Sequence, residues 1–341
     1  MSRMDGAHGI NQVISTQEAV KRLRDGDVVA IPTETVYGLA ASIEHPEALT
    51  SIYTLKGRPK DNPMILHGAS IEQLLPFVEG WNQAHQACAD AFWPGPLTLI
   101  LRASERVPSV VTAGLDTVAI RVPNHPLALE ILEQTGPLAA PSANLSGKPS
   151  ATKASHVTDD FGDAVTVVDG DQASIGLEST VVWALEDTWR VLRPGLIGAE
   201  EIDQVANITV DDTSARVEAT QSAEADQTPL SPGTKYRHYT PKAKVLWLDM
   251  KQLIKPEFTN TTRLLFITNS EQIRSEIETL IRKNNTVYHH HATTLDLLAK
   301  QLYDWFRSAD MQDIDTIFIE KFKPLTPTDF TLVNRITKAI N

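Results

Sequence analysis

The sequence predicts an α/β protein made of two folded units. Its 341 residues lie at the upper edge of what a single hydrophobic core supports, so two domains are expected. Short apolar runs bounded by turns alternate with stretches of helical periodicity along most of the chain. Strand–helix alternation of this kind predicts, in each unit, a parallel sheet covered by helices.

In the first unit, the apolar runs that we expect to be strands are bounded by turn residues. These runs are Asp27–Ile31, Leu97–Leu101, Val118–Val122, Val165–Val168 and Ser179–Trp183. Helical spacing of apolar residues predicts helices at Thr16–Arg24, Pro46–Lys56, Ile71–Phe77, Trp81–Phe92 and Pro126–Thr135.

The second unit shows a simpler alternation of predicted strands and helices. Strands are expected at Lys244–Leu248, Arg263–Ile267, Thr286–Tyr288 and Asp315–Ile319. Helices are expected at Glu271–Arg282, Thr293–Phe306 and Asp329–Ile340.

A polar, acidic stretch separates the two units. Glu200–Leu230 opens with a plausible short helix and strand, and it holds eight acidic residues against one basic residue, Arg216. From Asp211 onward it lacks aromatic residues and periodicity, which is typical of a solvated linker. The linker ends at Ser231–Pro241 (SPGTKYRHYTP), where basic and aromatic residues appear abruptly.

Composition narrows the class of protein. The chain is 42% hydrophobic and 22% charged, as in an ordinary globular protein, and its net charge of −12 does not predict a nucleic-acid partner. The sequence shows no membrane-length apolar run and no signal-peptide pattern, so we expect no membrane association and a cytoplasmic location. The single cysteine, Cys88, allows no internal disulfide and is expected in the core.

Two segments rich in polar groups follow predicted elements in the first half of the chain. Ile31–Ala40 (IPTETVYGLA) places three hydroxyls and a carboxylate around a glycine at the end of a strand. Lys56–His67 (KGRPKDNPMILH) brings alternating cations to a turn, where Arg58 offers a planar fork suited to phosphate or carboxylate. Ordinary turn chemistry and a solvated basic loop are the structural alternatives.

Three further segments carry candidate ligand groups. Pro141–Ala154 (PSANLSGKPSATKA) offers many hydroxyl and backbone donors and little bulk, as a phosphate cradle requires, although a plain surface loop has a similar composition. Ser179 and Arg193 stand at strand ends, and Arg121 lies in an apolar strand where a charge needs a partner or a cleft. The run His289–His291 does not predict a metal site, because consecutive strand residues alternate faces.

Seven ordered motifs resemble one family. They read PTETVYGL, KGRPKDNPMILH, WPGPLTLIL, VAIRVPNHP, PSANLSGKPSAT, GLESTVV and RPG, and they resemble the YrdC/TsaC family of threonylcarbamoyl-AMP synthases. The linker motif and the trailing α/β unit are similar to the family's long, two-domain form. The resemblance implies a twisted α/β YrdC-like catalytic domain with a concave basic cavity at 12–198. It also implies a linker at 199–242 whose SPGTKYRHYTP segment acts as a lid, and a smaller Rossmann-like parallel-sheet domain at 243–341.

The resemblance also implies a reaction. L-threonine, bicarbonate and ATP, with Mg²⁺, would give L-threonylcarbamoyladenylate, diphosphate and water, the first step of t6A modification at position 37 of tRNA. A threonylcarbamoyl-transferase complex would receive the product, and direct binding of tRNA is a further possibility of the family. Catalysis would fall to Lys56 and Arg58. The implied nucleotide-binding residues are Lys56, Arg58, Asn62, Thr117, Ser142, Asn144, Thr152, Arg193, Tyr236, Arg237 and His238. The implied threonine-binding residues are Thr35, His67, Arg121, Ser142 and Ser179.

The charges of the reactants indicate how such an enzyme works. A threonine carbamate and ATP are both anions, so the site must reduce their repulsion and align them. Two alternatives remain: a double-stranded RNA-binding or regulatory module without synthase activity, and a carbamoyl-transfer enzyme of the hydrogenase-maturation type. The second requires many zinc-binding cysteines, and one cysteine argues against it.

Overall fold

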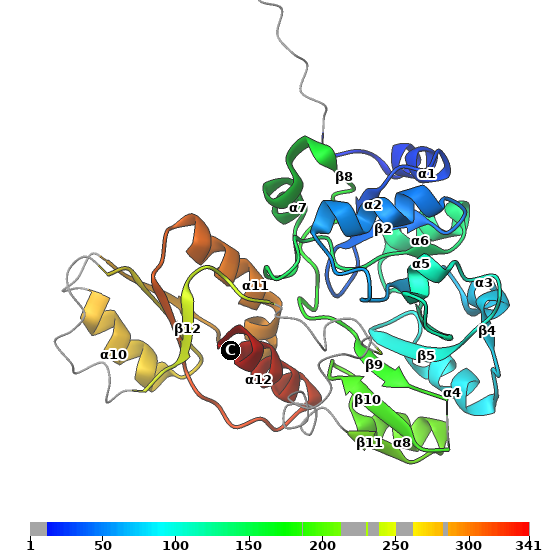
Figure 1. Ribbon diagram of the computed structural model, residues 1–341. Helices are drawn as coiled ribbons and strands as arrows, with labels where there is room; N and C mark the ends of the chain where they lie inside the picture. The colour runs from blue at the N-terminus through cyan, green and yellow to red at the C-terminus, as the bar shows by residue number, and fades with distance from the viewer. Residues whose placement is uncertain are drawn as a thin grey trace, which may run out of the picture.

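The computed structural model describes residues 12–185, 187–212, 230, 239–249, 262–281 and 286–340. These residues form two α/β domains, each built on its own sheet (Figure 1). The predicted two-domain α/β architecture is confirmed.

The sheet of the first domain is mixed. Among the described residues it has eleven strands in the order β11-β10-β9-β5-β6-β3-β7-β2-β1-β8, with β4 beside β5. The strands are β1 (Val29–Ile31), β2 (Gly38–Ser42), β3 (Ile65–His67), β4 (Val78–Glu79), β5 (Leu97–Ala103), β6 (Thr117–Arg121), β7 (Leu138–Ala139), β8 (Thr166–Val167), β9 (Thr180–Trp183), β10 (Trp189–Arg193) and β11 (Val210–Asp212).

The expectation of a parallel sheet is wrong for this domain. The neighbours β1 and β2 run antiparallel, as do β5 and β6, whereas β3–β6 and β5–β9 are parallel. The connection between β1 and β2 is residues 32–37 alone, which is too short for the crossover helix that a parallel pair needs. Sequence periodicity also missed β2, because its residues Gly-Leu-Ala-Ala-Ser lack the β-branched side chains typical of strands.

Helices cover the first sheet. They are α1 (Thr16–Arg24), α2 (Pro46–Lys56), α3 (Ile71–Leu74), α4 (Gln83–Phe92), α5 (Ser109–Thr112), α6 (Pro126–Thr135), α7 (Ala154–Phe161) and α8 (Ala199–Ala206), with short 3₁₀ turns at Leu75–Phe77 and Gly162–Ala164. Local sequence explains their ends. Ser15 accepts a hydrogen bond from the Glu18 amide at the start of α1, and Gly57 ends α2 with a φ of 60°, a left-handed conformation that favours glycine.

The first domain extends beyond residue 198, where the sequence analysis began the linker. Helix α8 packs against α4, and β11 pairs with β10 as a parallel edge strand. The buried side chains of Ile202 and Ala206 join the main core of the domain. Of the remaining linker, the structure describes only Leu230 and 239–242.

The second domain has the predicted parallel sheet. Its strands are β12 (Lys244–Trp247), β13 (Leu264–Thr268), β14 (Val287–His291) and β15 (Thr316–Ile319), in the order β12-β15-β13-β14. All of these pairs are parallel, as in Rossmann-like folds, but the first strand lies at an edge instead of in the centre of the sheet.

Alternating side chains let helices cover both faces of this sheet. Leu265 and Ile267 pack with α11 (Leu295–Met311) and α12 (Pro327–Ile340), whereas Phe266 packs with Ile277 of α10 (Glu271–Ile281). Figure 1 shows α11 and α12 on the side of the sheet that faces the first domain, with α10 on the far side. Both facing helices contact the first domain: Arg307 of α11 donates to the Pro149 carbonyl, and Arg335 of α12 donates to Glu178.

No helix in the described part of the chain is both long and apolar enough to cross a bilayer.

Candidate active site

A cavity of about 680 Å³, including its open mouth, lies in the first domain where several strands end. Strand ends supply many of its polar groups: His67 closes β3, Arg121 closes β6, and Arg193 closes β10. Seven of the predicted site residues line it, namely Thr35, Arg58, His67, Arg121, Ser142, Ser179 and Arg193. The fold therefore collects residues from motifs spread over more than half of the first domain's sequence.

Each of the three guanidinium nitrogens of Arg121 contacts a different residue. Its Nε donates to the Gly95 carbonyl at 3.1 Å, Nη1 donates to the Thr35 hydroxyl at 3.0 Å, and Nη2 lies 2.6 Å from a carboxylate oxygen of Glu34. Both charged side chains are buried. Because a buried charge needs a partner, the Glu34 carboxylate balances the charge of Arg121, and the hydrogen bonds to Gly95 and Thr35 set the orientation of the guanidinium.

Arg193 and Ser179 form a second unit of the cavity wall. The Arg193 guanidinium donates to the Ser179 carbonyl at 3.1 Å and to the Ser179 hydroxyl at 3.0 Å. The same hydroxyl lies 2.8 Å from that of Thr98. Residue 195 must be a glycine for its backbone to pack against the Ser179–Thr180 backbone, since a Cβ there would lie 2.2 Å from the Thr180 nitrogen.

His67 is a neutral group in this site. Burial, and secondly the nearby Arg121, lower the pKa of His67 to about 3. Its Nδ1 lies 3.1 Å from the Ile65 carbonyl, which can only accept, so Nδ1 carries the proton and Nε2 is an acceptor. The ring therefore offers a lone pair to a donor in the cavity.

Arg58 provides another cation at the cavity. Its guanidinium donates to the carbonyls of Asn62 at 3.1 Å and Pro63 at 2.7 Å, which anchors it to the turn after α2. Burial lowers its pKa to about 10, so it remains protonated at neutral pH. Lys60 is exposed and lies outside the cavity lining.

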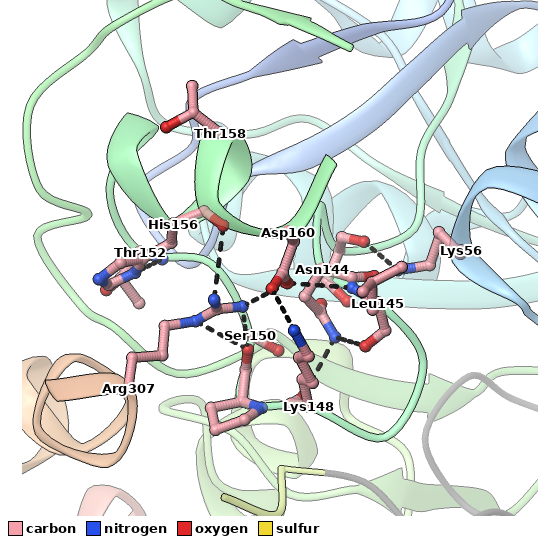
Figure 2. A network of polar contacts seen from close by, with 12 residues as sticks. Lys56, Asn144, Leu145, Lys148, Ser150, Thr152, His156, Thr158, Asp160 and Arg307 are labelled. Carbon is pink, nitrogen blue, oxygen red and sulfur yellow. Dashed lines mark hydrogen bonds and ion pairs between the residues drawn. The ribbon is translucent and has the colours of Figure 1, made fainter. Parts of the chain in front are cut away.

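Lys56 behaves differently from Arg58. It is the last residue of α2, its side chain is buried, and its ammonium donates to the carbonyls of Ser142 and Asn144 (Figure 2). Burial lowers the pKa of Lys56. It does not line the cavity. The structure thus shows Lys56 tying α2 to the predicted phosphate loop, and a direct contact with phosphate stays a prediction.

The 141–152 loop forms most of the predicted phosphate cradle Pro141–Ala154, and a cluster of polar side chains contacts it (Figure 2). Buried Asp160 of α7 accepts from the Leu145 amide at 3.1 Å and from Lys148 at 2.9 Å. Arg307 of α11, in the second domain, contacts Asp160 at 2.8 Å and donates to the Pro149 carbonyl at 2.6 and 3.1 Å. One guanidinium therefore joins the second domain to this loop.

Replacing Arg307 with methionine is expected to lower the free energy of unfolding by about 3–5 kcal/mol, because Asp160 would lose its most buried partner. Urea unfolding measures the effect. The matched control, Arg274→Met, removes an arginine whose ion pairs along α10 are exposed and should cost about 0.5 kcal/mol. Equal losses in the two variants would show that the buried contact contributes nothing of its own.

The remaining predicted residues lie outside the cavity lining. Thr117 is buried in β6, the Thr152 backbone amide donates to His156, and Asn144 donates to carbonyls within its own loop. Asn62 is buried, and no hydrogen-bond partner is found for its side-chain oxygen in the described structure. Tyr236, Arg237 and His238 lie outside the described residues, so the predicted lid segment is not tested.

Glu178 and Tyr239 are among the cavity-lining residues that sequence reasoning did not assign to the site. Glu178 is an acid between Leu177 and Ser179 in a largely apolar motif, and that contrast is a signal for a buried, partnered charge. Tyr239 closes the basic and aromatic segment of the linker, and it is buried with a φ of 66°.

This arrangement defines a class of protein. A concave site that combines guanidinium groups, hydroxyls and a neutral imidazole suits an enzyme that holds small anionic substrates.

The comparisons with known proteins agree with this class of protein. A family model described as "Telomere recombination", covering Sua5, YciO and YrdC proteins, matches residues 21–195. A second, described as the C-terminal domain of threonylcarbamoyl-AMP synthase, matches residues 197–340. The chain belongs to the threonylcarbamoyl-AMP synthase family.

Relatives match over nearly the whole chain. A threonylcarbamoyl-AMP synthase of Bacillus subtilis is 40% identical over 331 residues, covering 94% of this chain and 92% of the relative. A synthase of Pyrococcus abyssi is 37% identical, covering 93% and 91%. The crystal structure of P. abyssi Sua5 complexed with L-threonine superposes with a TM-score of 0.78 at 36% identity, covering 95% of this chain and 94% of that one. The family resemblance expected from the motifs is confirmed.

Proposed function

We propose that this chain makes L-threonylcarbamoyladenylate from L-threonine, bicarbonate and ATP, releasing diphosphate and water. One observation carries the proposal: a single cavity holds the guanidinium groups of Arg58, Arg121 and Arg193 beside the neutral imidazole of His67. The relatives reported above are named for this synthase, and none of those names supports an RNA-binding module without activity.

Threonine is proposed to bind at the Arg121 side of the cavity. The guanidinium, oriented by Thr35 and Glu34, would take the amino acid carboxylate. The hydroxyls of Thr35 and Ser179 would hydrogen-bond the threonine side chain. The His67 Nε2 lone pair would accept from a donor of the substrate.

ATP is proposed to bind along Arg58, Arg193 and the 141–152 loop. The carbamate formed on the threonine nitrogen attacks the α-phosphorus, and diphosphate leaves. Both reactants are anions, so the fixed cations lower their repulsion and support the charge that develops in the transition state. No side-chain nucleophile is needed: Cys88 is buried in the core, and burial raises its pKa to about 12.

Mg²⁺ is proposed to arrive with ATP. Glu178 is the one carboxylate lining the described cavity, and it is already bonded to Arg335, Tyr303 and Ser150. Such a donor set fits a metal held mainly by phosphate oxygens and water, with the Ser142 hydroxyl as a neutral neighbour. When bound, the metal would neutralise phosphate charge and assist departure of diphosphate.

The proposal includes a place for the reaction in the cell. We expect the enzyme in the cytoplasm, where its product supplies a threonylcarbamoyl-transferase complex that completes t6A on tRNA. Binding of tRNA by this chain itself is a separate expectation, and it is tested by gel shift with and without ATP and threonine.

The deciding experiment incubates the purified chain with ATP, threonine and bicarbonate, and follows diphosphate and the carbamoyl-adenylate by mass spectrometry. Formation of both, dependent on threonine and on bicarbonate, supports the proposal. Diphosphate release without bicarbonate would instead indicate direct adenylation of an amino acid.

Substrate choice follows from the same pocket. Serine lacks one methyl group, so we expect its kcat/KM to fall by about fivefold, equal to about 1 kcal/mol. Valine replaces the hydroxyl with a methyl group and leaves polar groups such as Ser179 unpaired, so its kcat/KM is expected to fall by about a hundredfold or more. Competition between the amino acids measures both ratios, and valine matching threonine would contradict the assigned pocket.

A further inference from the structure

Arg335 belongs to α12 of the second domain, yet it ends inside the first domain. Its side chain is completely buried. Its Nε donates to Glu178 at 2.8 Å, and its Nη2 donates to the Pro194 carbonyl at 3.0 Å. Both partners are immediate neighbours of residues proposed to bind substrate, because Glu178 precedes Ser179 and Pro194 follows Arg193.

Both carboxylate oxygens of Glu178 accept hydrogen bonds. One carboxylate oxygen accepts from Arg335 and, at 3.1 Å, from the Tyr303 hydroxyl of α11, while the other accepts from Ser150 at 2.6 Å. Burial alone would raise the pKa of Glu178, but the Arg335 and Arg193 guanidinium groups hold it below its usual range. Glu178 therefore stays ionised, and its position depends on the second domain.

Arg335 also contacts a third part of the cavity wall. Its guanidinium lies over the Tyr239 ring at 5.1 Å from the centroid, and the Tyr303 ring stacks on that of Tyr239 with the two centroids 5.6 Å apart. Thr331, one turn earlier on α12, donates to the Gly195 carbonyl at 2.8 Å. Helix α12 therefore donates to two successive carbonyls of the 193–195 turn, those of Pro194 and Gly195.

We propose that Arg335 is a positioning residue for the synthase reaction: it fixes Glu178, the 193–195 turn and Tyr239, and through them the Ser179–Arg193 unit that contacts substrate. The inference rests on the proposed function and assigns the second domain a role in it. Arg335 does not line the cavity, so it acts through its neighbours and not by touching substrate.

A planar fork is what this role requires. One guanidinium spans a carboxylate and a carbonyl from different segments while its face covers a ring, whereas a lysine ammonium has neither the planar shape nor the reach for all three. Arg335→Lys should therefore keep the buried charge and lose the positioning. Arg335→Met should lose both.

The test measures steady-state kinetics, threonine binding by calorimetry and thermal melting for the full-length chain. For Arg335→Lys we expect a melting temperature within a few degrees of wild type, a KM for threonine raised about tenfold and a smaller change in kcat. For Arg335→Met we expect about a hundredfold loss of kcat/KM, as misplacement of substrate contacts produces. The control Arg274→Met, on α10, should match wild type.

A double-variant cycle separates positioning from general destabilisation. If Arg335 acts through Ser179, then Ser179→Ala combined with Arg335→Lys should raise the threonine KM no further than the worse single variant. Additive effects, or wild-type threonine binding in folded Arg335→Lys, would overturn the inference. If wild type and Arg274→Met form no carbamoyl-adenylate, the proposed function itself fails, and calorimetry still decides whether Arg335 controls threonine binding.

Discussion

Replacing Arg58 with alanine is expected to reduce diphosphate release by about 30- to 1,000-fold, equal to about 2–4 kcal/mol of transition-state stabilisation. Arg58 lies at the cavity, anchored to two carbonyls of its own turn, and is protonated at neutral pH. Loss of a fixed cation would remove the proposed charge-assisted contact to phosphate. Stopped assays of diphosphate at saturating threonine measure the change.

Lys56, the neighbouring cation, is expected to affect both diphosphate release and stability when it is replaced. Lys56→Ala is also expected to abolish most diphosphate release, but with a lower melting temperature, because the ammonium ties α2 to the Ser142 and Asn144 carbonyls. Arg58→Lys, which keeps the charge, should recover part of the activity. Near wild-type turnover in both alanine variants would exclude the phosphate assignment.

Changing Arg121 to glutamine is expected to weaken threonine binding by at least about a hundredfold, because the carboxylate would lose its charged partner. The same change leaves Glu34 buried without its cation, so the protein should also lose about 3–5 kcal/mol of stability. Isothermal calorimetry with threonine and urea unfolding measure the two effects.

A second variant separates these two effects of Arg121. Glu34→Gln combined with Arg121→Gln removes both charges, and we expect it to recover most of the lost stability without recovering threonine binding. Recovery of threonine binding in the double variant would mean that Arg121 only balances Glu34 and does not hold the substrate.

The part of the site that the sequence predicted consists of polar residues in motifs at the ends of predicted strands. Arg121 stood out as a charge in an apolar strand, whereas Thr35, His67 and Ser142 were assigned through the family resemblance of their motifs, and all four line the cavity. Lys56 was placed by its spacing from Arg58, but it ends a helix, and helix geometry turns its ammonium toward loop carbonyls. Spacing along the chain does not fix the direction of a side chain.

The chain sequence by itself determined the two α/β units, most of the long helices, the parallel sheet of the second domain and the family. These depend on local periodicity and on contiguous motifs, which short-range physics controls. Tertiary structure decided the mixed pairing of the first sheet, the inclusion of α8 and β11 in the first domain, and the entry of Arg307 and Arg335 into its loops. Arg335 and Glu178 lie 157 residues apart, and each is an ordinary charged residue in its own segment. Only packing of α12 on the first domain removes both from water, and burial is what makes each charge require the other.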